Sequence, residues 1–369
     1  MRIAINARSI LLKRPTGIGR YTYHLIDNLG TIDSNNQYQL YVQKKFWDTK
    51  RTLPKFSYSN FQTKTDFFGR GPNRFLKGVD IYHSPSPDTI DIEKPKVVVT
   101  IHDLIYKTYP QGHTQETIDL TQRHMQQIVK RADHIICISQ NTQGDLHRFF
   151  DFPKEKTSVV YNGVDHRQFY LLGPQEKSEA KEALVQMGIV DPFILFVGTI
   201  EPRKNLAGLL EAFASLRQKK QFKGKLVVAG MKGWMMQSVE PLMARLGIKE
   251  DVIFTGFISD DQLRILYNLA EVFVFPSFYE GFGFPIVEAF CCGGAVVCSN
   301  VSSCSEIAAD AALSVEPENI SQIAEAVKKL LEDKACNQDF RQKALKRAEF
   351  FSFHKTAKET LDVYEKILF

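Results

Sequence analysis

The sequence predicts an α/β protein of two doubly wound domains, in which helices cover both faces of each parallel sheet. Three observations support this prediction. The chain has 369 residues, which is more than one ordinary domain holds. Apolar runs of strand length alternate with amphipathic stretches, and strands that are apolar on both faces are typical of buried parallel sheets. Turn residues and charges interrupt this alternation near the middle of the chain.

The first half contains five apolar runs that predict strands. They read MRIAINA, VDIYHSP, VVVTIHD, HIICISQ and TSVVYNG, and they begin at residues 1, 79, 97, 134 and 157. Apolar residues at helical spacing predict helices over 19–29 and 114–131.

The second half repeats the pattern with FILFVGT, KLVVAG, DVIFTGF, VFVFPS and AVVCSN, which begin at residues 193, 225, 251, 272 and 295. Helices are predicted over 206–216, 259–269 and 320–331. A terminal helix is also predicted, because helical spacing relates Phe353, Ala357, Leu361, Tyr364 and Leu368.

The stretch from 168 to 190 is rich in turn residues and charge, and it predicts the connection between the halves. We therefore expect an N-terminal domain over 1–170 and a C-terminal domain over 171–350, with the terminal helix, about 351–369, packed back on the first domain. Ligands of α/β proteins bind beyond the carboxyl ends of the strands. Two such domains predict a site in a crevice between them, lined by loops that follow strands.

Composition predicts a soluble globular protein, with 44% hydrophobic and 24% charged residues. No stretch approaches the eighteen or so uninterrupted apolar residues of a membrane span. The opening MRIAINARSI does not have the pattern of a secretory signal. We therefore expect a cytoplasmic location.

Six cysteines lie mostly within apolar runs, as small core residues of a reduced protein do. Four of them gather between 291 and 304, but their spacing lacks the paired C-x-x-C of structural zinc sites. We expect neither disulfides nor a metal site.

The positive charge is concentrated in residues 41–80. This segment holds nine lysines and arginines and three aspartates, a local balance of +6, whereas the whole chain has a net charge of +5. Aromatic residues are interleaved with these charges: Phe46, Trp47, Phe56, Phe61, Phe67, Phe68 and Phe75. The segment is either a solvated loop region or a surface that meets anionic lipid or a phosphorylated acceptor. We expect no nucleic-acid partner.

The segment SFYEGFGFPIVEAF places Glu280 and Glu288 on either side of a glycine-rich loop. A buried strand precedes the loop, and Pro285 suits the first turn of the helix that follows it. Amides near the start of this helix favour an anion such as phosphate. The two acids can then accept hydrogen bonds from hydroxyls. The alternative is an acidic cap beside an ordinary glycine turn.

In GTIEPRKN, Arg203 and Lys204 stand where a helix begins. Cations are disfavoured there by the helix dipole unless an anion is bound. The pair is therefore either a clamp for a pyrophosphate or a surface pair that tolerates its position.

Two stretches of the first half also follow strands. Gly17 and Gly19 open a helix, but Thr22 stands where the dinucleotide-binding fingerprint has its third glycine. His102 follows the strand VVVTI. It is either a structural histidine or a polar contact for a sugar.

Together, GTIEPRKN, EGFGFPIVEA with its E-x7-E spacing, TIHDL and SSCSEIAADAAL resemble the family 4 retaining glycosyltransferases of the GT-B type. The resemblance covers essentially the whole chain. TGIGRYT and TIHDLIYKTYP are similar to the mannosyltransferase-like branch of that family. The fold that this resemblance implies is two Rossmann-like domains facing a central crevice.

The resemblance implies four residues at the reacting centre. Arg203 and Lys204 would bind the donor diphosphate, and Glu280 would bind hydroxyls of the donor sugar. His102 would contact the sugar near the reacting carbon from the first domain.

It also implies a set of contacts with the rest of the donor. Glu288 would bind the ribose, Gly17 would approach the phosphate, and amides at Phe282, Gly283 and Phe284 would hold sugar and phosphate. Gly256 and Phe257 would lie beside the base. The sequence departs from the family pattern at Ala295, where proline is usual, and at Cys304 and Ser305, which replace Leu-Pro; these changes put the local loop shape in question.

The reaction that follows is that of a hexosyltransferase, which moves a sugar from a nucleotide diphosphate to a hydroxyl with retention. GDP-mannose is the expected donor, and the expected acceptor is a glycan or lipid-linked molecule in the assembly of cell-surface polysaccharide. A UDP-sugar is the alternative donor, since nothing in the loops separates guanine from uracil. A sugar-nucleotide epimerase and a catalytically inactive binding protein are further alternatives.

No cofactor is expected, and no divalent metal, because the chain lacks a convincing D-x-D strand end and the cations at 203 and 204 can stabilise the diphosphate instead. The basic segment allows peripheral contact with the inner face of the cell membrane.

Overall fold

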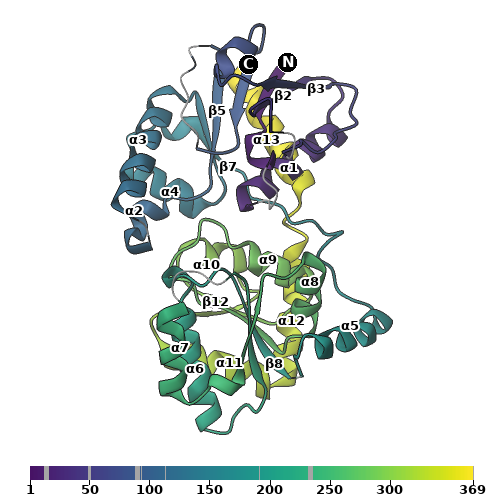
Figure 1. Cartoon of the computed structure of the whole chain (residues 1–369), viewed down its shortest axis with the longest axis vertical. Helices are drawn as coiled ribbons and strands as arrows, with labels where there is room; N and C mark the ends of the chain where they lie inside the picture. The colour runs from purple at the N-terminus through teal and green to yellow at the C-terminus, as the bar shows by residue number, and fades with distance from the viewer. Residues whose placement is uncertain are drawn as a thin grey trace. The chain divides into compact units, whose positions relative to one another are not determined.

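The computed structural model describes residues 1–11, 16–48, 51–87, 92, 94–112, 114–190, 192–231 and 236–368. The chain forms two compact units, which are Met1–Gly163 together with Ser352–Phe369, and Val164–Phe351. Figure 1 shows a sheet and surrounding helices in each unit.

The boundary after Gly163 lies before the linker expected over 168–190. Hydrogen bonds give the reason. The Leu172 N–H donates to Asn268 Oδ1 at 2.8 Å, and Asn268 Nδ2 donates to the Tyr170 carbonyl at 3.0 Å. The chain from 164 onward is therefore already part of the second unit, whereas the sequence-based expectation placed the boundary at 170.

The first unit is built on a parallel sheet of seven strands in the order β3-β2-β1-β4-β5-β6-β7. The strands are β1 (Arg2–Asn6), β2 (Gln37–Gln43), β3 (Phe61–Asp66), β4 (Ile81–Ser84), β5 (Lys96–Ile101), β6 (His134–Cys137) and β7 (Thr157–Val159). Its α-helices are α1 (Gly17–Ile32), α2 (Ile105–Thr108), α3 (Gln115–Arg131), α4 (Gln140–Phe149) and α13 (Phe353–Leu368). Short 3-10 helices are η1 (Arg8–Leu11), η2 (Pro72–Phe75), η3 (Pro110–Gly112) and η4 (Lys154–Lys156).

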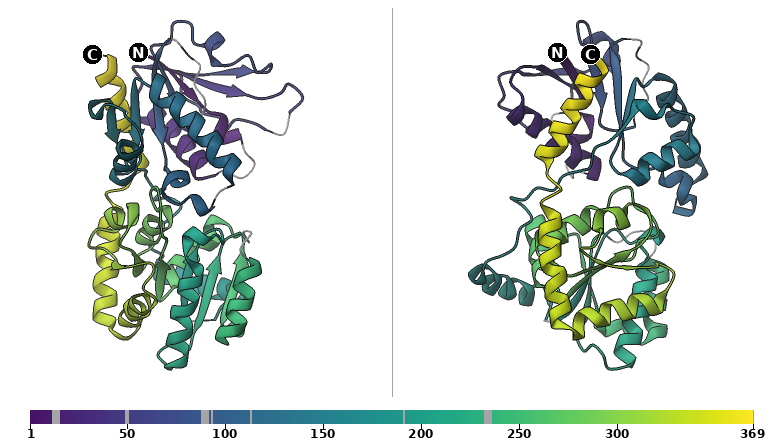
Figure 2. Two further views of the ribbon diagram at one scale, coloured as in Figure 1. Left: turned by 90° about the vertical axis from the view of Figure 1, so that its left-hand side faces the viewer. Right: turned by 180° about the vertical axis from the view of Figure 1, so that it is seen from behind.

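The terminal helix α13 lies alongside α1 and belongs to the first unit (Figure 2). Buried hydrogen bonds join it to the sheet. The Tyr364 hydroxyl lies 2.6 Å from His83 Nδ1, and His83 Nε2 lies 2.9 Å from the Thr100 hydroxyl. Burial lowers the pKa of His83 to about 3, so this histidine is neutral at physiological pH.

The second unit is built on a parallel sheet of six strands in the order β10-β9-β8-β11-β12-β13. The strands are β8 (Phe193–Val197), β9 (Lys225–Ala229), β10 (Val252–Gly256), β11 (Val272–Phe275), β12 (Val296–Ser299) and β13 (Leu313–Val315). The helices are α5 (Pro174–Gln186), α6 (Leu206–Gln218), α7 (Met236–Leu246), α8 (Asp260–Leu269), α9 (Phe284–Cys291), α10 (Ser302–Ala308), α11 (Ile320–Glu332) and α12 (Lys334–Ala348), with 3-10 helices η5 (Pro202–Lys204) and η6 (Lys249–Asp251).

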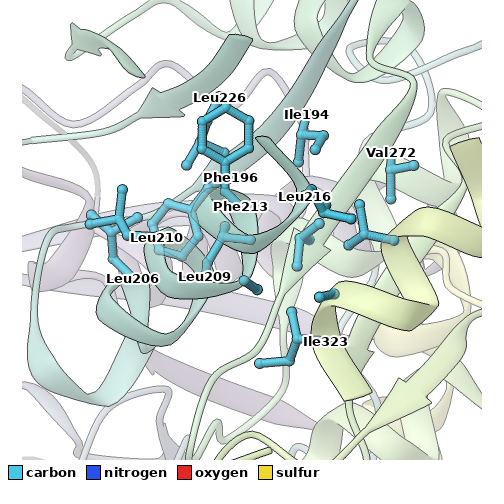
Figure 3. Close-up of a cluster of buried hydrophobic side chains, with 14 of the residues drawn as sticks. Ile194, Phe196, Leu206, Leu209, Leu210, Phe213, Leu216, Leu226, Val272 and Ile323 are labelled. Atoms are coloured by element: carbon cyan, nitrogen blue, oxygen red, sulfur yellow. The ribbon is translucent and has the colours of Figure 1, made fainter. Parts of the chain in front are cut away.

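A buried apolar cluster fixes α6 against this sheet. Leu209, Leu210 and Phe213 of α6 are almost fully buried beside Ile194 and Phe196 of β8, as Figure 3 shows. Burying a side chain of this size stabilises a fold by roughly 1.5–3 kcal/mol. The cluster therefore holds the start of α6 in a fixed place at the edge of the sheet, directly after the short helix η5 that carries the cationic pair.

The predicted fold class is confirmed, since both sheets are parallel and alternate with helices. All ten predicted strands are present, as β1 and as β4 to β12. In the described part of the chain, none of the helices combines the length and the apolar character needed to span a bilayer.

Candidate active site

Two loops meet at the carboxyl edge of the second sheet. Strands β8 and β11 are paired, so the loops that follow them are neighbours. Asn205 joins the loops. Its Oδ1 accepts from the Gly208 N–H at the start of α6, and its Nδ2 donates to the carbonyls of Pro276 at 3.1 Å and Pro317 at 2.6 Å. Residues 203 and 204 are thereby held against the loop that carries Glu280.

Arg203, Lys204 and Glu280 form one ionic cluster. Lys204 Nζ donates to Glu280 Oε1 at 2.6 Å, and Arg203 Nη1 lies 2.8 Å from the same oxygen. Arg203 also donates to the Tyr279 carbonyl at 2.6 Å and forms an ion pair with Glu201. The sequence predicted these residues at one site but did not predict that they bind one another.

Glu280 is ionised in this cluster. Its exposed fraction is only 7%, and burial alone would raise its pKa. The cations Lys204 and Arg203 outweigh burial, so the net effect lowers the pKa of Glu280. The cluster therefore combines two cations and an anion in a largely desolvated place, where electrostatic interactions are stronger than in water.

The backbone of Glu280 is fixed as firmly as its side chain. Its N–H donates to Ser302 Oγ at 3.0 Å, and Ser303 Oγ donates to its carbonyl at 2.9 Å. The Phe278 N–H donates to the Arg203 carbonyl at 2.8 Å. These bonds order the loop before any ligand binds, which reduces the entropy cost of binding.

Helix α9 begins directly after this loop. Gly283 precedes it with φ +100°, a backbone conformation that L-amino acids rarely adopt but that glycine adopts readily. No side chain caps the helix there. The Phe282 side chain is 3% exposed and packs against the rings of Phe284 and Phe351. Its side chain is therefore part of the core, and only its backbone is available for a ligand.

Glu288 lies inside α9 and is buried. The Tyr267 hydroxyl, from α8, donates to Glu288 Oε2 at 3.0 Å. Tyr267 is itself fully buried, with its ring at the edge of Phe169 and Phe273. The hydroxyl therefore fixes the direction of the Glu288 carboxylate.

Gly256 and Phe257 lie at the end of β10. The Gly230 N–H donates to the Gly256 carbonyl at 3.0 Å, and Gly256 has φ +69°. The Phe257 side chain is exposed. An exposed aromatic ring at a strand end is suited to stacking on a flat ligand group.

The first unit carries the two remaining candidates, Gly17 and His102. Gly17 is the first residue of α1, and Thr16 caps this helix by accepting from the Gly19 N–H at 3.2 Å. His102 follows β5, and Tyr21 of α1 contacts its ring edge-on with centroids 5.0 Å apart. Both candidates therefore lie at the same edge of the first sheet.

The environment of His102 determines its protonation. His102 Nε2 lies 2.7 Å from the Pro85 carbonyl. Since a carbonyl only accepts, Nε2 carries the proton and Nδ1 is the acceptor. Burial lowers the pKa of His102 despite this bond. The imidazole is therefore neutral near pH 7.

Sequence comparison matches most of each unit to known families. A family described as Glycosyltransferase Family 4 matches residues 15–168, and one described as Glycosyl transferases group 1 matches residues 183–347. The O-antigen chain mannosyltransferase B of Escherichia coli is 28% identical over 375 residues, which cover 95% of this chain and 96% of that protein. The chain belongs to glycosyltransferase family 4. The predicted family and the predicted enzyme class are confirmed.

Other relatives of this glycosyltransferase are longer. The serotype-specific mannosyltransferase WbdA of Escherichia coli is 28% identical over 74% of this chain, which spans only 34% of WbdA.

Solved structures show the same GT-B fold. Sucrose-phosphate synthase from Thermosynechococcus elongatus aligns with a TM-score of 0.78 at 20% identity, over 100% of this chain and 99% of that one. Anabaena HepE in complex with UDP and glucose aligns with a TM-score of 0.75 at 19% identity, over 99% and 100% of the two chains.

The structure thus brings Arg203, Lys204 and Glu280 of the glycosyltransferase into direct contact and gives Glu288 a separate partner. The sequence reasoning missed Asn205, Tyr267 and the two serines that bind the Glu280 backbone. Asn205 could have been found as an N-cap, since asparagine before an apolar helix is a common start signal. Among the described residues, no three histidine, cysteine or acidic side chains are grouped to hold a metal ion.

Proposed function

We propose that this glycosyltransferase transfers mannose from GDP-mannose to a hydroxyl of a glycan or lipid-linked acceptor, with retention, in the assembly of a cell-surface polysaccharide. The observation that carries the proposal is its similarity to the O-antigen chain mannosyltransferase B over nearly the full length of both chains. WbdA, whose name also describes a mannosyltransferase, supports the choice of sugar.

In this proposal the ionic cluster handles the leaving diphosphate. Lys204 Nζ has three N–H donors, so it retains hydrogen-bonding capacity beyond its contact with Glu280. A diphosphate adds negative charge next to both cations. Charge that grows on the leaving group in the transition state is then stabilised without rearrangement of the loop.

The acids have different tasks. Glu280 lies beside the cations and accepts hydrogen bonds from the donor sugar. Glu288, eight positions along the chain and held by Tyr267, accepts from the ribose. The backbone amides of Phe282, Gly283 and Phe284 bind sugar and phosphate, and Gly256 with Phe257 contacts the base.

Two residues act from the first unit. Gly17 approaches the phosphate, and His102 contacts the sugar. Because Nε2 of His102 is bound to the Pro85 carbonyl, Nδ1 is the atom that accepts from a sugar hydroxyl. A neutral imidazole here adds no positive charge to a developing oxocarbenium centre.

Retention follows without a protein nucleophile in this proposal. The acceptor hydroxyl attacks the anomeric carbon on the face that the diphosphate leaves, and its proton passes to a phosphate oxygen. The new glycosidic bond forms as the bond to the diphosphate breaks. The protein supplies position and electrostatic stabilisation.

A UDP-sugar donor is the second candidate. HepE, whose fold matches over nearly the whole chain, has been solved with UDP and glucose. Hydroxyl stereochemistry is read by a few hydrogen bonds, so small changes in a pocket can change the donor.

A panel of nucleotide sugars tests the proposal. Thermal stabilisation and hydrolysis should be greatest with GDP-mannose, and the product formed on a suitable acceptor should keep the α configuration of the donor. A clear response to a UDP-sugar with none to GDP-mannose would overturn the donor assignment. Binding without hydrolysis or transfer would favour the inactive binding protein, and release of an epimer would favour an epimerase.

A cytoplasmic location remains a prediction of this proposal. All six cysteines are free, and five of them are buried. Burial raises the pKa of the Cys137, Cys291 and Cys304 thiols to about 12, which makes them unreactive. Unreactive free thiols fit a reducing compartment.

A further inference from the structure

The basic segment 41–80 forms a hollow on the first unit, at the carboxyl ends of β2 and β3. The hollow has a volume of about 760 Å³, which is within the usual range for ligand pockets. Four cations line it: Arg8, Lys44, Lys45 and Arg51. The only acid in its described lining is Asp48, which forms an ion pair with Arg51 at 3.2 Å. The hollow therefore keeps a net positive charge.

Large aromatic side chains are displayed around the same hollow. The exposed fractions are 65% for Phe46, 64% for Trp47, 42% for Phe67 and 71% for Phe68. Exposed apolar side chains gathered in one place usually mark a binding surface.

The other aromatic residues of the segment serve the fold. Phe61 stacks on Tyr38 with centroids 4.5 Å apart, Phe75 lies against Tyr41, and Phe56 lies against Tyr23. The seven phenylalanine and tryptophan residues of the segment therefore divide into three that pack against tyrosines and four that are displayed. The first three are half-buried, and none of the seven belongs to the buried core.

Hydrogen bonds order the turn that exposes Phe68. The Asp66 carboxylate accepts from the Tyr41 hydroxyl at 3.1 Å, the Phe68 N–H at 3.1 Å and the Gly71 N–H at 3.0 Å. Burial alone would raise the pKa of Asp66, but the hydrogen bond from the Arg70 N–H and these three bonds outweigh burial and lower the pKa. The charged carboxylate thus holds the turn that presents Phe68 outward.

Cations and rings are also combined locally. Lys45 Nζ lies 5.3 Å from the centre of the Trp47 ring, and the Arg70 guanidinium lies 4.9 Å from the Phe68 ring. Aromatic and cationic side chains in such proximity are typical of the membrane interface, where rings enter the headgroup layer and ammonium groups meet phosphates.

We propose that this hollow, lined by residues 8, 43–48, 51 and 67–69, docks the protein on a bilayer surface rich in anionic phospholipid. The cations bind lipid phosphates, and Phe46, Trp47 and Phe68 enter the interface. A water-soluble anion would use the cations but would leave these rings exposed, so the combination favours a lipid surface. The inference concerns attachment and does not depend on the identity of the donor.

Vesicle binding tests this inference. Flotation with vesicles of phosphatidylcholine containing 30% phosphatidylglycerol at low salt should carry the protein upward, whereas pure phosphatidylcholine should not. Binding should weaken as salt rises, because the Debye length falls from about 30 Å at 0.01 M to about 3 Å at 1 M. In a Trp234→Phe variant, which leaves Trp47 as the single tryptophan, emission should shift to the blue on binding.

Matched variants separate the contribution of the cations to vesicle binding from that of the exposed aromatic side chains. Lys45→Gln with Arg51→Gln should lower the partition coefficient about fivefold per charge, whereas Lys219→Gln with Lys223→Gln, which removes the same charge from exposed sites of the second unit, should not. Phe46→Ser with Phe68→Ser should abolish the binding. The exposed pair Val185→Ser with Val190→Ser is its control.

Three results would overturn the inference: no flotation with anionic vesicles at low salt, equal binding to neutral vesicles, or unchanged binding of the Phe46→Ser, Phe68→Ser variant. Thermal unfolding of each variant confirms that it is folded. The vesicle experiment contains no sugar nucleotide. A negative vesicle result therefore does not contradict the proposed transfer reaction, and a negative transfer assay does not contradict the proposed membrane attachment.

Discussion

A single carboxylate oxygen of Glu280 contacts both cations of the proposed donor site. In the absence of a ligand, Arg203 and Lys204 thus have a compensating charge, which avoids the cost of two buried cations side by side. In the proposed complex, the diphosphate is a further anionic partner for both cations. Glu280 therefore balances the charge of the two cations, in addition to the sugar contact that we propose for it.

The two acids should have different kinetic roles. Glu280→Gln removes the charge beside the cations and should lower kcat by about tenfold, the effect of one charge-assisted bond. Glu288→Gln should instead raise the donor KM, because ribose contacts act in ground and transition states alike. Steady-state kinetics with varied donor measure both constants. Glu325→Gln, at an exposed helical site, is the control. Identical changes of kcat and KM in the two test variants would refute the proposal that the two acids have different roles.

Tyr267 should act through Glu288. Tyr267→Phe removes the hydroxyl that donates to Glu288 Oε2 and keeps the buried ring, so the donor KM should rise about three- to tenfold, the effect of one hydrogen bond of ordinary strength. kcat should change little. Tyr170→Phe removes a comparable surface bond to Glu176 in the same unit and should have no effect on KM.

A double variant tests whether Tyr267 affects the donor KM by orienting Glu288 or by packing in the core. If Tyr267 acts only by orienting Glu288, Tyr267→Phe should add almost nothing to the KM of Glu288→Gln. Additive effects in the double variant would mean that Tyr267 contributes independently, through the core.

At the residue scale, the sequence predicted the candidates better than their partners. The E-x7-E spacing and the Arg-Lys pair indicated one donor site, but the shared oxygen of Glu280 and the bond from Tyr267 join residues that are distant in sequence. The first contact depends on the pairing of β8 with β11, and the second depends on the packing of α8 against α9. Neither has a local signal in the sequence.

At the element scale, the start of α9 depends on Gly283. Its φ of +100° costs an L-residue roughly 1–2 kcal/mol, and a Cβ here would lie 3.3 Å from Ile286 Cδ1. Gly283→Ala should therefore lower the free energy of unfolding by about this amount and should also raise the donor KM, because the first amides of the helix shift.

Gly247→Ala is the matched control for this substitution. Gly247 also has a positive φ, +69°, and a Cβ there would meet nothing within 4 Å. Chemical denaturation should show a comparable loss of stability for both variants, whereas only Gly283→Ala should change the donor KM. An equal change of KM in both would show that the effect is general destabilisation.

The elements that sequence reasoning missed have physical reasons in common. Strand β3, FQTKTD, lies at the edge of the first sheet, and its central residues are exposed. Strand β2, QYQLYVQ, mixes glutamines with its apolar residues, and β13 has only three residues. Continuous apolar runs identify central strands of a parallel sheet. The edge strands β3 and β13 have no such run, and β2, which lies between β3 and β1, has none because glutamines interrupt its apolar residues.

At the scale of the whole molecule, charge and chemistry are divided between the units. Residues 41–80 of the first unit hold a balance of +6, and the whole chain has +5. The other residues together are therefore nearly neutral. The positive charge proposed to meet a membrane belongs to one unit, and the cluster proposed to bind the diphosphate belongs to the other.

The order of the main strands and helices along the chain was predictable in outline. Helical spacing predicted the terminal helix, and the helix itself lies with α1 in the first unit. The contact that joins it to the sheet, between Tyr364 and His83, links residues 281 positions apart. No sequence pattern indicates such a pair, and the boundary after Gly163 was missed because it carries no change of composition.

The most direct test of the central claim is calorimetric titration of the protein in EDTA with the nucleotide sugar that stabilises it most. The wild-type chain should bind without added metal, because Arg203 and Lys204 provide the positive charge. Lys204→Ala should weaken binding about ten- to a hundredfold, the effect of one charge-assisted bond, whereas Lys225→Ala, which removes a surface lysine paired with Asp251, should not. Equal affinity of Lys204→Ala and wild type, or binding that requires Mg²⁺ or Mn²⁺, would contradict the account.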